Sequence, residues 1–266
     1  MSDSPPGHPE IERVTAPNPG PMTLEGTNTY VVESDGTAWV VDPGPDDPTH
    51  IAAVLEAAER RGGVAGVLLT HSHADHSQAV EQLGAPLVWG SVGTDDEGSP
   101  TSGAGATDQR WPPEPPAEPI GPFLIVATPG HSVDHVCLLS GRVCFSGDLI
   151  LGSGSSFVPP DGGSLAAYLS SLARLRDLDL ELLCPGHGPF VTDPLAKIDE
   201  YREHRLERER RLLGALGEGI RSRQELLERA WDDVSDALRP AAAHVMQAHL
   251  EKLEAEGRLI PAELTD

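Results

Sequence analysis

The histidines of this chain carry its most specific chemical signal. Four segments each pair an apolar run with a turn that offers imidazole or carboxylate groups. The first turn is His71-Ser-His-Ala-Asp-His76, and the later ones carry His131, Asp148 and His187. Loops at one end of a sheet converge in space while the strands beneath hold them rigid. The pattern therefore predicts a metal site built from separate turns.

Imidazole nitrogen and carboxylate oxygen together favour zinc, with manganese or iron as alternatives. The candidate ligands are His71, His73, Asp75, His76, His131, Asp148 and His187. Such a set is too large for one tetrahedral ion, so we expect two ions per chain that share a bridging ligand. The tight spacing of the first four ligands is expected by chance in roughly one such sequence in a thousand.

The ligand-bearing turns need strands beneath them, and the apolar periodicity predicts short ones. These are Thr29–Val32, Trp39–Val41, Gly66–Leu69, Pro86–Trp89, Phe123–Ala127, Val136–Leu139, Arg142–Phe145 and Leu182–Cys184. One helix is predicted from the N-cap Asp47 to a stop at Gly62, and another from about Ser164 to Leu178. This alternation predicts an α/β fold in which helices cover sheets.

Between Ser91 and Pro119 the periodicity gives way to Gly, Ser, Thr, Asp and Pro. A segment of this composition is typical of a flexible surface insertion. Because it lies between a strand and the next ligand-bearing turn, a substrate lid is the alternative interpretation.

After Pro194 the chain becomes rich in Arg, Glu and Leu. Ser222 has a glutamate three residues later, which predicts a helix start, and Gly257 is expected to end a final helix before a short strand at 258–260. We therefore predict one domain over residues 1–193 and a small helical domain over 194–266. The second domain is expected either to cap the active-site mouth or to form a homodimer.

The composition limits the partners and the compartment. The chain has 42 Asp and Glu but only 19 Lys and Arg, which gives a formal net charge of -23. The negative electrostatic field of such a protein repels polyanions. No apolar stretch approaches the roughly 18 residues of a spanning helix, and the start of the chain does not resemble a signal peptide. Cys137, Cys144 and Cys184 lie in or beside apolar runs, which favours buried free thiols. We expect a cytoplasmic protein without membrane association.

Four motifs occur in an order that resembles a known family. They are Thr70–His76, Thr128–Ser132, Ser146–Asp148 and Pro185–Gly188. On these residues the chain resembles the metallo-β-lactamase superfamily, and most of all its beta-lactamase-like protein 2 group, whose members are related to glyoxalase II and carry a C-terminal winged-helix-like extension. Residues 247–257 read like that extension. The resemblance implies an αβ/βα sandwich with a dinuclear site between its sheets.

The resemblance also implies an assignment of the ligands. One ion would be held by His71, His73 and His131. The other would be held by Asp75, His76 and His187, with Asp148 as the bridge. Antibiotic-hydrolysing relatives commonly have cysteine or serine where this chain has Asp148 and are exported, so β-lactam resistance is not expected here.

Two ions that share a water lower its pKa from 15.7 to about 7, so the expected reaction is hydrolysis by a metal-bridging hydroxide. The predicted catalytic residues are Asp75, which could also shuttle a proton, the bridging Asp148, and His135. Asp42 and Asp134 are candidate acceptors for the N–H groups of ligand imidazoles. A simple turn role for Asp42 and a core role for His135 remain open.

The substrate class stays open between two hydrolytic alternatives. A small ester, thioester or lactone-like acyl compound suits the acidic surface and the glyoxalase II likeness. Single-stranded RNA cleavage would use the arginines between 202 and 223 as a phosphate track, but Glu203, Glu207 and Glu209 favour a salt-bridged helix instead. A mononuclear iron dioxygenase and a nucleic-acid-binding regulator are the non-hydrolytic alternatives.

Overall fold

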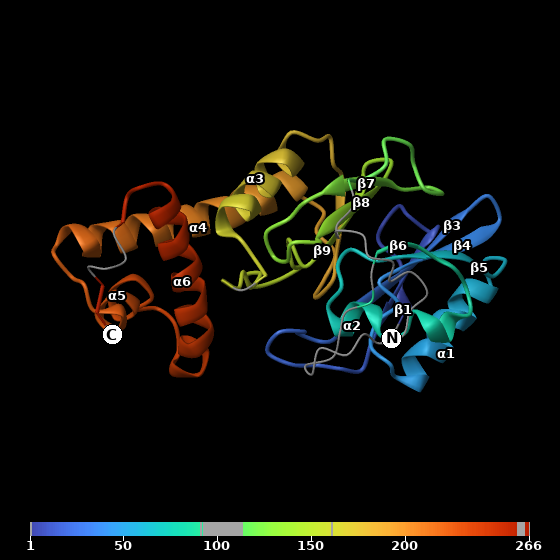
Figure 1. The fold of residues 1–266 in the computed structure, drawn as a ribbon. Helices are drawn as coiled ribbons and strands as arrows, with labels where there is room; N and C mark the ends of the chain where they lie inside the picture. The colour runs from blue at the N-terminus through green and yellow to red at the C-terminus, as the bar shows by residue number, and fades with distance from the viewer. Residues whose placement is uncertain (1, 91, 93–113, 161, 260–263, 266) are drawn as a thin grey trace. The chain divides into compact units, whose positions relative to one another are not determined.

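The computed structural model describes residues 2–90, 92, 114–160, 162–259, 264 and 265 (Figure 1). The chain divides into two compact units. The first unit comprises Met1–Thr128, Asp134–Ser155 and Asp179–Pro194. The second comprises Pro129–Val133, Ser156–Leu178 and Leu195–Asp266. The predicted domain division at residue 193 stays a prediction.

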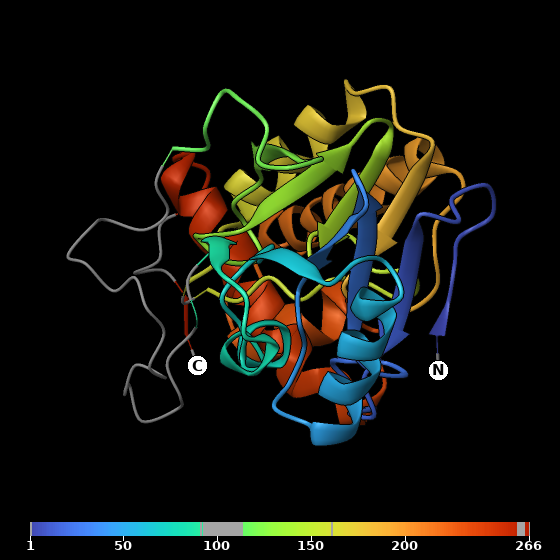
Figure 2. The same cartoon turned by 90° about the vertical axis from the view of Figure 1, so that its right-hand side faces the viewer.

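The first unit contains two sheets. One has the strand order β1-β2-β3-β4-β5-β6, formed by Ser2–Asp3, Ile11–Thr15, Asn28–Ser34, Thr37–Val41, Val64–Leu68 and Leu87–Trp89. The other has the order β10-β9-β8-β7, formed by Leu182–Pro185, Val143–Gly147, Val136–Ser140 and Leu124–Ala127. In the first sheet β4, β5 and β6 are parallel, and in the second β9 and β10 are parallel. Figure 2 shows the first sheet in blue to teal and the second in green to gold.

The two sheets enclose one apolar core. It joins Tyr30, Val41 and Leu68 of the first sheet to Leu138 and Phe145 of the second, all at most 2% exposed. A second cluster lies on the other face of the first sheet, where α1 (Pro48–Glu59) packs against β3, β4 and β5. The packed strands therefore fix the positions of the loops at their ends, as a site built from several loops requires.

The local signals behave as the sequence predicts. Asp47 caps α1 by accepting hydrogen bonds from the backbone N–H groups of Thr49 and His50. Gly62 follows the helix with a φ of +91°, a conformation that favours glycine. In the second unit Ser164 caps α3 (Leu165–Arg176) in the same manner. All the predicted strands of the first 193 residues are present within one or two residues of their expected bounds.

Strand β2, which pairs with β3, has no clear signal in the sequence. Only Ile11 and Val14 are apolar among its five residues. Glu12 is nevertheless 7% exposed, because both of its carboxylate oxygens pair with Arg60 and Arg61 just after α1. A buried ion pair therefore replaces the apolar residue that alternation would require.

The second unit is helical. Besides α3 it contains α4 (Pro194–Gly217), α5 (Arg223–Ala230) and α6 (Arg239–Ala255), with a 3-10 turn η2 at Asp236–Leu238. Leu212, Leu226, Trp231 and Leu253 belong to its core. Of the strand expected at 258–260, residues 258 and 259 are not in a strand, and residue 260 lies outside the described part.

The arginines of α4 are paired rather than arranged as an open cationic track. Arg208 binds Asp233 at 2.7 Å, Arg210 binds Glu203 and Glu207, and Arg211 binds Asp232. Of the pairs predicted from the interleaved charges, those of Arg210 with Glu203 and Glu207 form within α4, whereas Glu209 pairs with Lys252 and Arg258.

Three further expectations have direct outcomes. Cys137, Cys144 and Cys184 are free and buried, as predicted. Among the described residues no helix has the length and apolar character needed to cross a membrane. Most of the insertion predicted at 91–119 falls on residues 91 and 93–113, which lie outside the described part of the chain.

His249 on α6 gives the second unit a dependence on pH. Its side chain is fully buried, 5.7 Å from the Trp231 ring, and neither ring nitrogen has a hydrogen-bond partner among the described residues. Burial, assisted by the cations of Arg205 and Lys252, lowers the pKa of His249 to about 3. An unfolded histidine has a pKa of about 6.5.

The folded state therefore binds fewer protons than the unfolded state between these two pKa values. The stability of the fold is therefore highest above pH 6.5, where His249 is neutral in both states, and it falls by about 1.4 kcal/mol per pH unit toward pH 3. We expect His249→Leu to flatten this slope and to stabilise the fold at pH 7 by about 1 kcal/mol, because it removes two unsatisfied nitrogens. Urea unfolding between pH 4 and 7 measures both effects. His244→Gln, at an exposed position of the same helix, is the control, and an unchanged slope in His249→Leu would contradict the assignment.

Candidate metal centre

The predicted ligands lie where strands end. His71 and His73 follow β5, and Asp75 and His76 lie on the short helix α2 (Ala74–Ser77) that comes next. Asp148 follows β9, and His187 follows β10. Because β9 and β10 are parallel neighbours, their last residues bring Asp148 and His187 to one edge of the sheet. Strand ends of the two facing sheets thus supply the ligands.

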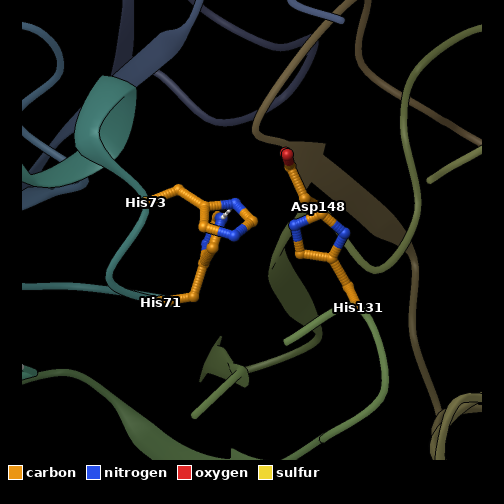
Figure 3. Close-up of side chains that lie close together, drawn as sticks. All are labelled: His71, His73, His131 and Asp148. Carbon is orange, nitrogen blue, oxygen red and sulfur yellow. Dashed lines mark hydrogen bonds between the residues drawn. The ribbon is translucent and has the colours of Figure 1, made fainter. Parts of the chain in front are cut away.

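The ligand atoms form two groups, and within each group they lie within 4.8 Å of one another. The first group is His71, His73, His131 and Asp148. The second group is Asp75, His76 and His187. Figure 3 shows His71 and His73, from one segment, facing Asp148 and His131 from two others. Ligand atoms about 2.1 Å from one ion are at most roughly 4.2 Å apart, so small side-chain adjustments would close either group around a divalent ion.

Asp148 links the two groups. Its Oδ1 lies 3.5 Å from His76 Nε2, and its Oδ2 lies 3.3 Å from His187 Nε2. Asp75 reaches the same imidazoles, with its Oδ2 at 3.5 and 3.4 Å from these nitrogens. In the part of the chain that the structure describes, the buried His76 Nε2 makes no hydrogen bond. A buried acceptor nitrogen that faces two carboxylates is a good fit to a divalent cation.

Asp42, at the end of β4, fixes the tautomers of two of the predicted ligands, His71 and His76. Its Oδ1 and Oδ2 each accept a hydrogen bond from Thr70, from the backbone N–H and the hydroxyl, both at 2.7 Å. The Thr70 hydroxyl gives its one proton to Asp42, so it must accept at 3.0 Å from Nδ1 of His71. His76 Nδ1 lies 2.9 Å from Asp42 Oδ2 and donates to it directly. Both imidazoles therefore present Nε2 to the site.

Asp42 is held in this role by an unusual backbone. It has a φ of +50° and is 2% exposed, and its carbonyl accepts from the Thr29 hydroxyl at 2.6 Å. A non-glycine residue in this conformation stores strain, which its three accepted side-chain hydrogen bonds offset. Asp42 therefore both adopts the turn conformation and accepts a hydrogen bond from an imidazole N–H, the two alternatives that the sequence left open.

Two of the three remaining imidazoles are oriented by carbonyl oxygens. His131 Nδ1 donates to the carbonyl of Phe157 at 2.7 Å, and His187 Nδ1 donates to that of Gly26 at 3.3 Å. Each bond leaves Nε2 with the lone pair that a metal requires. His71 Nε2 and His73 Nδ1 are 2.9 Å apart and share a proton in the protein without metal.

The charges at the site favour bound cations. Burial alone would lower the pKa of His76, but the carboxylates of Asp75, Asp148 and Asp42 raise it well above its usual value. Burial likewise opposes ionisation of Asp148, yet His187 and His76 hold its pKa well below the usual range. Without metal the imidazoles carry the protons that neutralise these carboxylates, and metal binding would release those protons.

Two glycines leave room for the ligands. A Cβ at Gly186 would lie 2.5 Å from Asp148 Oδ1 and 2.7 Å from His76 Cε1. At Gly147, where φ is +46°, a Cβ would lie 2.5 Å from the Thr70 hydroxyl and 2.8 Å from His135 Nε2. Both glycines belong to motifs noted in the sequence, but their steric role depends on contacts between separate segments.

His135 has a different place from the ligands. Its ring is buried 5.3 Å from the His71 ring, and its Nδ1 lies 2.9 Å from the Thr128 hydroxyl. It belongs to neither group of ligand atoms among the described residues, so its catalytic role stays a prediction. Asp134 is also buried. The sequence reasoning missed Thr70 as the link between Asp42 and His71, although Thr70 lies in the quoted motif.

Comparison with known proteins identifies the family of this chain. Residues 22–187 match the Metallo-beta-lactamase superfamily, and residues 222–263 match the Beta-lactamase associated winged helix domain. A Drosophila melanogaster protein named Beta-lactamase-like protein 2 homolog is 31% identical over 274 residues, which cover 94% of this chain and 89% of that protein. An Aspergillus chevalieri protein named Atrochrysone carboxyl ACP thioesterase is 32% identical, covering 94% and 83%.

A solved metallo-beta-lactamase family protein from Thermus thermophilus shares the fold, with a TM-score of 0.70 at 23% identity over 94% of each chain. The chain belongs to the metallo-beta-lactamase superfamily. It has the mixed α/β fold of that superfamily followed by a winged-helix domain, and it is a metal-dependent hydrolase.

Proposed function

We propose that the chain is a dinuclear zinc hydrolase that cleaves small thioesters or related acyl esters. The observation that carries the dinuclear assignment is the position of Asp148, whose two oxygens face imidazoles of the second group while it also belongs to the first. In this assignment His71, His73 and His131 hold one ion, Asp75, His76 and His187 hold the other, and Asp148 bridges them.

When bound, two zinc ions would supply a water of lowered pKa and would polarise the substrate carbonyl. The protein fixes the donor atoms before the metal binds. Hydrogen bonds from Nδ1 of His71, His76 and His187 to Thr70, Asp42 and the Gly26 carbonyl direct the Nε2 atoms of these imidazoles into the site. Preorganised ligands lower the cost of reorganisation during the reaction.

Asp75 is the carboxylate best suited to move a proton. Its side chain is 29% exposed, whereas that of Asp148 is 12% exposed and His76 is fully buried. A carboxylate that touches both the ligand imidazoles and solvent can pass a proton from the attacking water to the departing thiolate or to bulk water. This role is the one the sequence predicts for Asp75.

A thioester substrate is supported by two considerations. The Aspergillus relative is named a thioesterase and aligns over most of this chain. The net charge of -23 opposes approach of a polyanion, and the paired arginines of α4 offer few free cations to a phosphate backbone. These features favour acyl hydrolysis over cleavage of single-stranded RNA.

The experiment that tests this choice compares substrates on one zinc-loaded preparation. We expect turnover of members of an acyl thioester panel, abolished in Asp148→Ala, and no cleavage of labelled single-stranded RNA. RNA cleavage that Asp148→Ala abolishes, without thioester turnover, would overturn the substrate assignment. The cytoplasmic location, the homodimer and the division into domains 1–193 and 194–266 stay predictions.

A further inference from the structure

The loop before β3 contacts two of the three ligands in the second group. Thr27 is fully buried, and its hydroxyl donates to Asp75 Oδ2 at 2.8 Å. Its backbone forms a bridge pair with that of His187, and the preceding Gly26 carbonyl accepts from His187 Nδ1. None of the predicted site residues comes from this loop.

Asn18 determines the direction of the Thr27 hydroxyl. Its Oδ1 accepts from the Thr27 backbone N–H at 2.9 Å, and this fixes the orientation of the amide because a backbone N–H can only donate. Asn18 Nδ2 therefore donates to Thr27 Oγ1 at 3.0 Å. With its oxygen occupied as an acceptor, the hydroxyl directs its single proton to Asp75.

Asp75 depends on this bond for its orientation. It lies on α2, a helix of four residues whose N-cap makes no side-chain hydrogen bond. Among the described residues, Thr27 is the hydrogen-bond donor to its carboxylate, and the other polar neighbours are the imidazoles of His76 and His187. Of these neighbours, the Thr27 hydroxyl is the one that is not itself a candidate ligand, so it can orient the carboxylate without binding the ion.

The loop itself is held in one conformation. Gly26 has a φ of +140°, and a Cβ there would lie 2.0 Å from the carbonyl oxygen of Ala16 and 3.1 Å from Asn18 Oδ1. The backbone N–H of Ala16 donates to the carbonyl of Thr27 at 2.8 Å. The Asn18–Thr27 pair is therefore a preformed support and not a surface contact.

We propose that Asn18 and Thr27 are positioning residues that set the affinity of the Asp75, His76 and His187 group for its ion. This inference rests on the proposed dinuclear function. Outer contacts that orient metal ligands are typically worth 10–100-fold in metal affinity. The support acts on Asp75, so its loss weakens the second ion more than the ion at His71, His73 and His131.

The test is a zinc titration of metal-free protein against a chromophoric chelator. We expect the wild type to bind two ions, and Thr27→Val to bind one ion with unchanged affinity and the other at least about tenfold more weakly. Thr27→Ser keeps the hydroxyl and is expected to restore affinity to within a few-fold. Excess zinc is expected to restore kcat in Thr27→Val, which a damaged fold would not allow.

Asn18→Ala provides a second variant if Thr27→Val fails to fold. It is expected to weaken the same ion by a smaller factor, and wild-type affinity for both ions in Asn18→Ala would then overturn the inference. Where Thr27→Val folds, Asn18→Ala is expected to have no further effect on zinc affinity in that background because it acts through Thr27. Two ions bound by Thr27→Val with wild-type affinities would overturn the inference and leave the proposed function intact. A wild type that binds fewer than two ions would instead contradict the proposed function.

Discussion

Replacing Asp148 by alanine is expected to lower kcat by at least about a thousandfold and to reduce the zinc content from two ions to one or none. The side chain takes part in both groups, since its two oxygens face His76 and His187 of the second group while it belongs to the first. Removing Asp148 also takes away one of the carboxylates that raise the pKa of His76, so the His76 imidazole binds its proton less tightly. His73→Ala is expected to abolish turnover as well.

The measurement combines steady-state kinetics with metal analysis of the same preparation. Asp148→Asn separates charge from shape, because it keeps one oxygen but loses the negative charge, and we expect it to retain less metal than the wild type. Asp199→Ala removes an exposed carboxylate that pairs with Arg176 and serves as the control with full activity. Turnover retained in Asp148→Ala would refute the assignment of the bridge.

Replacing Asp42 by alanine is expected to weaken zinc binding by about 10–100-fold, with a matching loss of activity at limiting zinc. Asp42 touches no ion in this account. It accepts from the Thr70 backbone, the Thr70 hydroxyl and His76 Nδ1. Without it the tautomers of His71 and His76 are no longer fixed, and buried donors lose their acceptor at about 1–3 kcal/mol each.

Asp47→Ala is the matched control for Asp42→Ala. Asp47 caps α1 in the same unit, so its loss is expected to cost about 1 kcal/mol of stability without changing zinc affinity. Chelator competition and urea unfolding on both variants separate the two effects. If Asp42→Ala binds zinc as tightly as the wild type, the hydrogen bonds of Asp42 to Thr70 and His76 do not set the zinc affinity.

The strands and caps were predictable because their signals are local. Asp47 with Pro48, and Ser164 before α3, mark helix starts by residue type alone. The seven candidate ligands could be proposed from the sequence because side chains able to bind a metal follow strand ends within recognisable motifs. Strand β2 was missed because Arg60 and Arg61, 48 and 49 residues away, make burial of Glu12 acceptable.

The supporting contacts were not predictable in the same way. Asp42 reaches Thr70 across 28 residues, and Thr27 reaches Asp75 across 48. Such pairs follow from how strands and loops pack, and no periodicity in the sequence records them. The crowding of Gly186 against Asp148 and His76 has the same origin.

The number of zinc ions bound per folded chain is the most direct test of the proposed dinuclear site. The protein is purified without added metal, analysed for transition metals by mass spectrometry, and then titrated with zinc. We expect two zinc ions per chain in the wild type, one or none in Asp148→Ala, and turnover that follows zinc content. One iron per chain, or a zinc titration that saturates below two ions, would contradict it.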